Sequence, residues 1–255
     1  MVDLAIPTPP DTAAPPVIMR IQIMSNSGLT ISEKPNKTVS NLMKFSLEED
    51  GFTRKIPDVF VKDIDKKWRG WIVLENGPSS FSPRVGIINF EINDALYHVA
   101  KQVYTEPYNN IKKSIIGPAT VMASLSELIG DPVEVYKVAS WCHLKDHPPE
   151  KVADDLVARI RDQGYEFIQS NLTLEALAES ALRYNVFIHA QRYSTPALLM
   201  RLGKTDSLNR FIQECVRFQR PEVQSPEYQK YAGLYQLYIT KMAEYLNFDA
   251  DKIEW

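Results

Sequence analysis

Arginine is the residue whose type and spacing in this chain point most directly to chemistry with a partner. Between residues 183 and 220, seven basic side chains stand against only Asp206 and Glu214. A guanidinium group binds phosphate or carboxylate through two parallel hydrogen bonds, and the interleaved aromatic rings could stack on bases. The segment is therefore a candidate site for RNA, single-stranded nucleic acid or another anion. Its basic residues are Arg183, Arg192, Arg201, Lys204, Arg210, Arg217 and Arg220.

The preceding segment is acidic, which opens two other interpretations of the arginines. Residues 146–179 contain eight acidic and three basic side chains. Most charge runs are solvated or paired faces, so composition favours pairing of the two segments within one molecule. An acidic and a basic patch on one subunit would also allow head-to-tail association between copies of the chain.

A second pattern is a row of tyrosines near the C-terminus. The steps between its members alternate between three and four residues, so all of them share one face of a helix. Tyrosine has an apolar ring and a polar tip, and each buried hydroxyl without a partner costs about 1–3 kcal/mol. A face open to a partner is therefore as reasonable as a core face. The row, called the tyrosine ladder below, comprises Tyr228, Tyr231, Tyr235, Tyr238, Met242 and Tyr245.

Other motifs predict no catalytic residue, no metal site and no cofactor. Cys142, His143 and His147 form a cluster of potential ligands, but no second cluster supplies the remaining ligands of a zinc site. Gly203-Lys204-Thr205 resembles the end of a phosphate-binding loop, but Leu198 occupies the position where that loop needs glycine. We therefore expect a non-enzymatic protein.

Size and composition are those of a globular protein. The chain has 255 residues, a net charge of −3 and 44% hydrophobic residues, enough to bury a sizeable core. Its N-terminus lacks the basic and apolar regions of a signal peptide, and no apolar run is long enough to span a bilayer. We expect an intracellular protein, cytoplasmic or carried within a viral particle, whose two cysteines are free thiols.

The elements that must position these side chains predict an α+β protein in three parts. Five prolines between residues 7 and 16 predict an extended arm over residues 1–16. Alternating hydrophobic residues predict a small β-rich subdomain over residues 17–92, with strands at 17–24, 58–64, 68–75 and 85–92.

From Asn93 onward the hydrophobic period changes to that of helices, which predicts a larger all-α domain over residues 93–255. Proline and glycine positions predict seven or eight helices within it. Gly164 is expected to end one of them in a left-handed conformation. The clearest predicted helices cover 94–106, 118–130, 150–163, 172–192, 195–203 and 226–247.

These patterns predict a structural protein that self-assembles or docks on a protein partner, like a viral coat, capsid or nucleocapsid subunit or a cellular scaffold. The alternative is an RNA- or single-stranded nucleic-acid-binding protein that uses residues 183–220. An unrecognised enzyme is the third possibility, and a deep pocket with titratable groups of shifted pKa would favour it.

Overall fold

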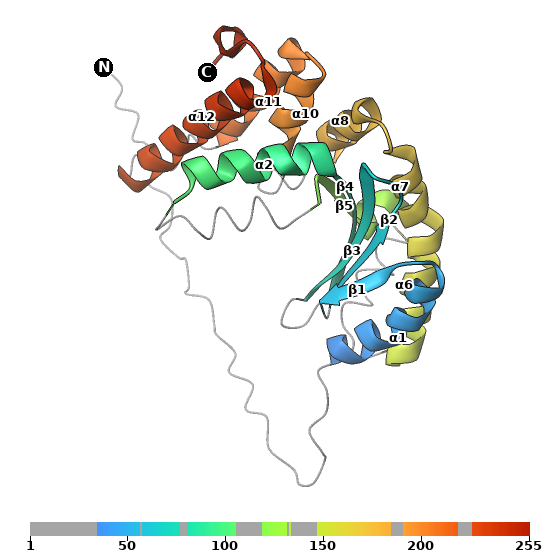
Figure 1. Cartoon of the computed structure of the whole chain (residues 1–255). Helices are drawn as coiled ribbons and strands as arrows, with labels where there is room; N and C mark the ends of the chain where they lie inside the picture. Colours follow the sequence, from blue (N-terminus) through green and yellow to red (C-terminus); the bar gives the residue numbers. More distant parts are fainter. Residues whose placement is uncertain are drawn as a thin grey trace, which may run out of the picture. The chain divides into compact units, whose positions relative to one another are not determined.

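The structure of this chain is a computed structural model (Figure 1). It describes residues 35–56, 58–76, 81–105, 119–131, 133, 147–184, 191–218 and 226–255. All of these belong to one compact unit. The predicted arm at 1–16 and the predicted strand at 17–24 lie outside the described residues.

A five-stranded antiparallel sheet organises the N-terminal half of the described chain, and its spatial order follows the sequence. Together with the helices that follow, it confirms the α+β class. The predicted strands at 58–64, 68–75 and 85–92 are present with small shifts of their ends. The strands are β1 (Thr53–Ile56), β2 (Val59–Asp63), β3 (Trp68–Asn76), β4 (Phe81–Asn89) and β5 (Val121–Ser124).

Successive side chains of a strand point to opposite faces of the sheet. Both faces of this sheet carry buried apolar side chains. In β3, Trp68 and Ile72 face the main core, whereas Trp71 lies in a second, smaller cluster with Val61 and Met122. Within the described chain, the sheet therefore buries apolar side chains on both of its faces.

The first described element is a helix that lies within the segment predicted to be β-rich, and no helix was predicted there. Residues Pro35–Glu49 form helix α1. Val39, Met43 and Leu47 recur at intervals of four residues, and all three are fully buried. That spacing is a helical signal, and it places one apolar face of α1 against the core.

Strand β5 corrects a second expectation, because it lies inside the helix predicted for residues 118–130. Val121 pairs with Ile87 of β4, and all four residues of β5 are buried. Burial on every side removes the alternation that identifies most strands. Only residues Leu125–Ile129 are helical, as α4, and Gly130 ends that helix at φ 66° as predicted.

Helices make up most of the remaining described chain (Figure 1). The first, α2, begins directly at the end of β4, where the Asn89 side chain accepts a hydrogen bond from the Ile92 amide. Helix α2 covers Phe90–Val103. The others are α6 (Pro149–Arg159), the π-helix η1 (Ile160–Gly164), α7 (Tyr165–Ser170), α8 (Leu174–Arg183), α10 (Ser194–Arg201), α11 (Thr205–Phe218), α12 (Pro226–Leu246) and the 3₁₀ turn η3 (Ala250–Lys252).

Gly164 does not end a helix as predicted. Its φ is −69°, and the chain runs from α6 through η1 into α7 without leaving the helical region. A side chain at this position would lie 3.1 Å from a methyl group of Val85 on β4. Glycine is therefore needed here for close helix–sheet contact rather than for a left-handed turn.

The main hydrophobic core joins one face of the sheet to the surrounding helices. It runs from Val39 of α1 through the sheet to Ile253 after η3. In Figure 1, α1 lies beside α6 next to the sheet, and α12 lies along α2. The sheet and the helical part are thus packed as one body within the described chain.

The two edge strands of the sheet are both protected. At one edge, β1 is four residues long and carries Arg54 and Lys55. At the other, the buried Gln191 side chain donates a hydrogen bond of 2.6 Å to the Met122 carbonyl of β5. Short, charged or covered edges resist pairing with further strands.

Gly86 and Gly233 provide a matched test of the packing. An added methyl group at Gly86 would lie 2.5 Å from Ala119 Cβ and 2.9 Å from the Val121 carbonyl oxygen, whereas nothing lies within 4 Å at Gly233. We expect Gly86→Ala to lower the free energy of unfolding by about 1–3 kcal/mol through overpacking. Gly233→Ala, at an exposed position of α12, should raise it by about 0.5–1 kcal/mol. Urea denaturation measures both, and equal effects would contradict the sheet register.

Candidate functional site

The tyrosine ladder turns largely into the core of its own chain. Tyr235, Tyr238 and Met242 are buried. The Tyr235 hydroxyl donates to the Arg192 carbonyl at 3.0 Å, and the Tyr238 hydroxyl has no partner among the described residues. Both rings pack with Tyr193 in edge-to-face contacts. The side chains of Tyr228 and Tyr231 lie outside the described residues.

Tyr245 is the described ladder tyrosine that reaches the surface. It is 44% exposed, and its ring lies 4.7 Å from that of His98 on α2. An outside partner of the ladder therefore remains a prediction. Among the described members, such a partner could reach Tyr245 but not the buried three.

The predicted arginine site is divided among several roles. Arg201 forms an ion pair of 2.7 Å with Glu91 of α2, not with the acidic segment 146–179. Arg192 lies over the rings of Tyr193 and Tyr235. Arg183, Lys204 and Arg210 lie on or after three different helices, while the side chains of Arg217 and Arg220 are outside the described residues. Nucleic-acid binding stays a prediction. At least one of the basic side chains counted in the sequence, Arg201, is already paired with an acidic group.

The outer side of α2 carries an exposed stripe, called the α2 stripe below, made of Asp94, Tyr97, His98 and Lys101. These positions are three or four residues apart and share one side of the helix. The Lys101 ammonium lies 4.3 Å from the centre of the Tyr97 ring, which is 43% exposed. On the neighbouring helix α12, Leu237 and Tyr245 are each 44% exposed. Two packed helices thus present aromatic and charged groups on rigid backbone.

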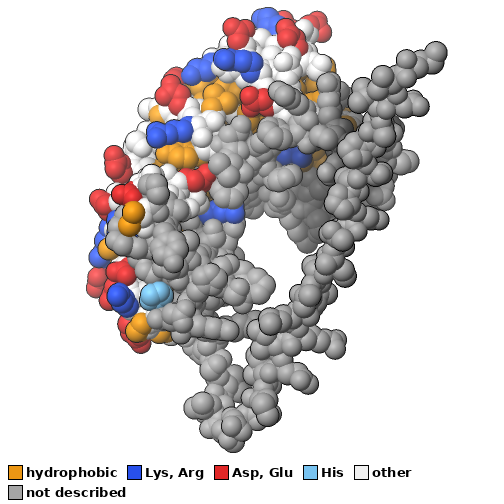
Figure 2. All heavy atoms as spheres, turned by 180° about the vertical axis from the view of Figure 1, so that it is seen from behind, with side chains coloured by type: hydrophobic (Ala, Val, Ile, Leu, Met, Phe, Trp, Pro, Cys, Tyr) orange, Lys and Arg blue, Asp and Glu red, His pale blue; other side chains and the backbone are white. Residues whose placement is uncertain are grey.

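Charges of both signs are mixed on the visible surface. Figure 2 shows acidic and basic side chains alternating along the described part of one face, with hydrophobic side chains between them. The described part of this face (Figure 2) therefore shows no groove of a single charge sign, which nucleic-acid backbone favours. Within the described residues, no helix combines the length and the hydrophobicity needed to cross a bilayer.

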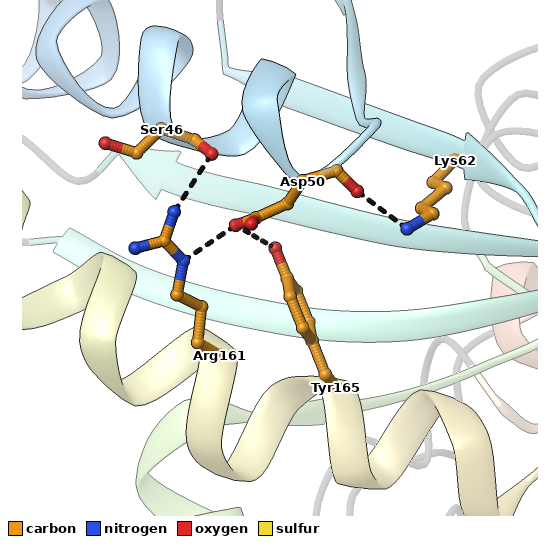
Figure 3. Close-up of polar contacts among 5 residues, drawn as sticks. All are labelled: Ser46, Asp50, Lys62, Arg161 and Tyr165. Carbon is orange, nitrogen blue, oxygen red and sulfur yellow. Dashed lines mark hydrogen bonds and ion pairs between the residues drawn. The ribbon is translucent and has the colours of Figure 1, made fainter.

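A network of polar side chains centred on Asp50 joins α1, the sheet and the π-helical region (Figure 3). The Asp50 carboxylate accepts hydrogen bonds from Arg161 Nε at 2.8 Å and from the Tyr165 hydroxyl at 2.7 Å. Lys62 of β2 donates to the Asp50 backbone carbonyl at 2.6 Å. Arg161 also donates to the Ser46 carbonyl near the end of α1. The network therefore fixes the turn after α1 against η1 and α7.

Both acidic groups of this network have shifted pKa values. Burial raises the pKa of Asp50, but hydrogen bonds from Arg161 and Tyr165 and the charges of Arg161 and Lys62 outweigh it, so the pKa lies below its usual value. Burial and the hydrogen bond to Asp50 raise the pKa of Tyr165. Asp50 is thus ionised and Tyr165 protonated throughout the neutral range.

A pocket of about 290 Å³ lies beside the network. Gly70 of β3 lines it, and a methyl group there would lie 3.2 Å from Ile168 Cδ1 and 3.6 Å from Phe52 Cε1. The Phe52 and Tyr165 rings stack at 5.5 Å with an angle of 18°. The pocket is lined by Phe52, Lys62, Asp63, Ile64, Gly70, Tyr165, Ile168 and Gln169.

The titrating groups of the network are held away from neutral pH. A general acid or base works best with a pKa near the working pH, and the shifts of Asp50 and Tyr165 both move away from neutrality. Burial raises the pKa of the Cys215 thiol to about 11, so it is not a ready nucleophile. Within the described part of the chain, no three metal-binding side chains come together.

Two signals in the sequence could have located the pocket. Glycine inside a strand often marks close approach of another group, and Gly70 interrupts the hydrophobic run of β3. Arg161 and Tyr165 are four residues apart, so they point from one side of a helix. Their common partner Asp50 is more than 100 residues away and could not be paired with them from sequence alone.

No family model, no curated protein and no solved structure matches this chain. The fold and the geometry of its surfaces are therefore the basis for assigning a function.

Tyr235 and Tyr238 form a matched pair that tests whether the ladder is core. Tyr235→Phe removes a hydroxyl bonded to the Arg192 carbonyl and should cost about 1 kcal/mol of unfolding free energy. Tyr238→Phe removes a buried hydroxyl without a described partner, so it should be neutral or stabilising. Chemical denaturation compares the two variants. The reverse order of stability would contradict the packing of the tyrosines.

Asp50→Asn should destabilise the protein by about 1–3 kcal/mol at neutral pH, because hydrogen bonds to a charged group are lost. The pKa of Asp50 is lower in the folded than in the unfolded protein. The stability contributed by its charge is therefore present above the unfolded pKa and is lost as the pH falls through the folded value. The difference between wild type and variant should shrink accordingly in denaturation experiments from neutral to acidic pH.

Glu48→Gln is the control for this experiment. It breaks an exposed ion pair with Lys44 on the same helix, which is worth less than about 1 kcal/mol. A cost equal to that of Asp50→Asn would show that the Asp50 network has no special role.

Proposed function

We propose that the protein is a non-enzymatic assembly subunit that self-associates through the α2 stripe. The observation that carries this proposal is the arrangement of the stripe. An acidic residue, Asp94, lies at one end, a basic residue, Lys101, lies at the other, and the exposed aromatic side chains of Tyr97 and His98 lie between them.

This arrangement is complementary to itself. If two copies pack antiparallel about a two-fold axis between Tyr97 and His98, Asp94 of one copy faces Lys101 of the other. Such a contact uses the same surface on both subunits and closes after two copies. The exposed rings of Tyr97 and Tyr245 supply apolar area at its centre and edge, as is typical of interface residues.

Other functions have weaker support from the same geometry. An enzyme would need titratable groups poised near neutrality, whereas Asp50 and Tyr165 are shifted away from it. A nucleic-acid-binding protein would need its arginines free on one surface, whereas Arg201 is paired with Glu91. Neither function has an observation as specific as the self-complementary stripe.

Charge reversal tests the contact directly. Asp94→Lys and Lys101→Asp should each raise the dimer dissociation constant about tenfold or more, since each places like charges opposite one another. The double variant restores opposite charges and should recover most of the lost affinity. Sedimentation equilibrium or native mass spectrometry at micromolar concentrations measures all four proteins.

Asp154→Lys is the matched control, because it makes the same charge change on the exposed side of α6 and should leave the dissociation constant unchanged. A wild type that stays monomeric at high micromolar concentration would reject self-association. A double variant no tighter than the single variants would reject this particular interface.

A further inference from the structure

We propose that the pocket beside Gly70 binds a small organic carboxylate with a flat apolar body, and that Lys62 donates hydrogen bonds to the carboxylate. This inference is independent of self-association, because no residue that lines the pocket belongs to α2 or α12.

The walls of the pocket favour a flat apolar group. Phe52 and Tyr165 present stacked rings, and Ile64 and Ile168 add aliphatic surface. The volume of about 290 Å³ is at the lower end of the range for ligand pockets. It therefore suits a body of about one ring better than a nucleotide.

The pocket is built before any ligand arrives. The Tyr165 hydroxyl is held by Asp50, and Asp50 is held by Arg161. Tyr165 and Ile168 follow directly after the π-helix η1, and single π-turns within helices occur often at functional sites. A ring entering between fixed walls loses little free energy to ordering of the protein.

Lys62 is the group in the pocket lining that can attract an anion. Asp63 is engaged by Arg69, and Asp50 is engaged by Arg161. Among the described residues, no carboxylate lies within ion-pair distance of Lys62, which lines the pocket and donates one hydrogen bond to a backbone carbonyl. An ammonium group has three donors, so Lys62 has two more to offer. The Gln169 side chain supplies a further polar group at the lining.

Phenylacetate and phenylacetamide are suitable probes, because they share a ring and differ in charge. Each is titrated into the full-length protein, and the amide signals of Gly70 and Gln169 are followed by two-dimensional NMR. We expect saturable shifts with phenylacetate and an affinity for phenylacetamide that is lower by about tenfold.

Lys62→Met removes the ammonium group but keeps much of its apolar stem, so it should abolish the preference for the carboxylate. Binding of phenylacetamide by this variant would show that the pocket is intact. Lys66→Met makes the same change at an exposed position outside the pocket, and it should retain the preference.

Three results would overturn the proposal. They are the absence of saturable shifts at Gly70 and Gln169 at millimolar ligand, equal affinity of the wild type for the two probes, and an undiminished preference in Lys62→Met. None of these results bears on the oligomeric state, so failure of the pocket and failure of the assembly interface remain distinguishable.

Discussion

The close approach of the α6–η1–α7 segment to the sheet is the constraint on which the rest of the described structure depends. Gly164 allows the helical segment to contact Val85, and Gly70 allows the sheet to receive Ile168 and Phe52. Both positions lack a side chain where a methyl group would press on a neighbour. Because the backbones meet this closely, Arg161 and Tyr165 reach Asp50, and the turn after α1 is fixed against the helical segment.

In the Asp50 network, the negative charge of Asp50 is balanced by the nearby positive charges of Arg161 and Lys62. The one negative group of this network, Asp50, has positive and hydrogen-bonding partners at short range, and the network keeps one protonation state across the neutral range. Such an arrangement cannot exchange protons easily during a reaction. It can hold aromatic walls still, which is what a binding pocket requires. Rigidity and lack of titration thus follow from the same contacts.

Patterns of neighbouring residues in the sequence were sufficient to predict those helices and strands that form from local preferences. The alternation in β2 to β4 and the proline and glycine positions around α10 and α12 were sufficient to find those elements. Helix α1 had a readable signal in Val39, Met43 and Leu47, whereas β5 is buried on all sides and has no period of its own. The conformation of Gly164 depends on Val85, and the pairing of Asp50 with Tyr165 spans 115 residues. Contacts of that range are set by tertiary packing, so no window of sequence contains them.

The covered edge at β5 has a consequence for how large an assembly of this protein can become. With the Met122 carbonyl occupied by Gln191 and the opposite edge short and basic, the described edge strands are poor templates for adding strands from another copy. Growth by strand addition has no natural end and leads to fibrils. Under the proposed self-association, contacts between copies would then use helix surfaces, whose geometry can limit the number of subunits. The described edges of this sheet thus disfavour open-ended aggregation through strand pairing.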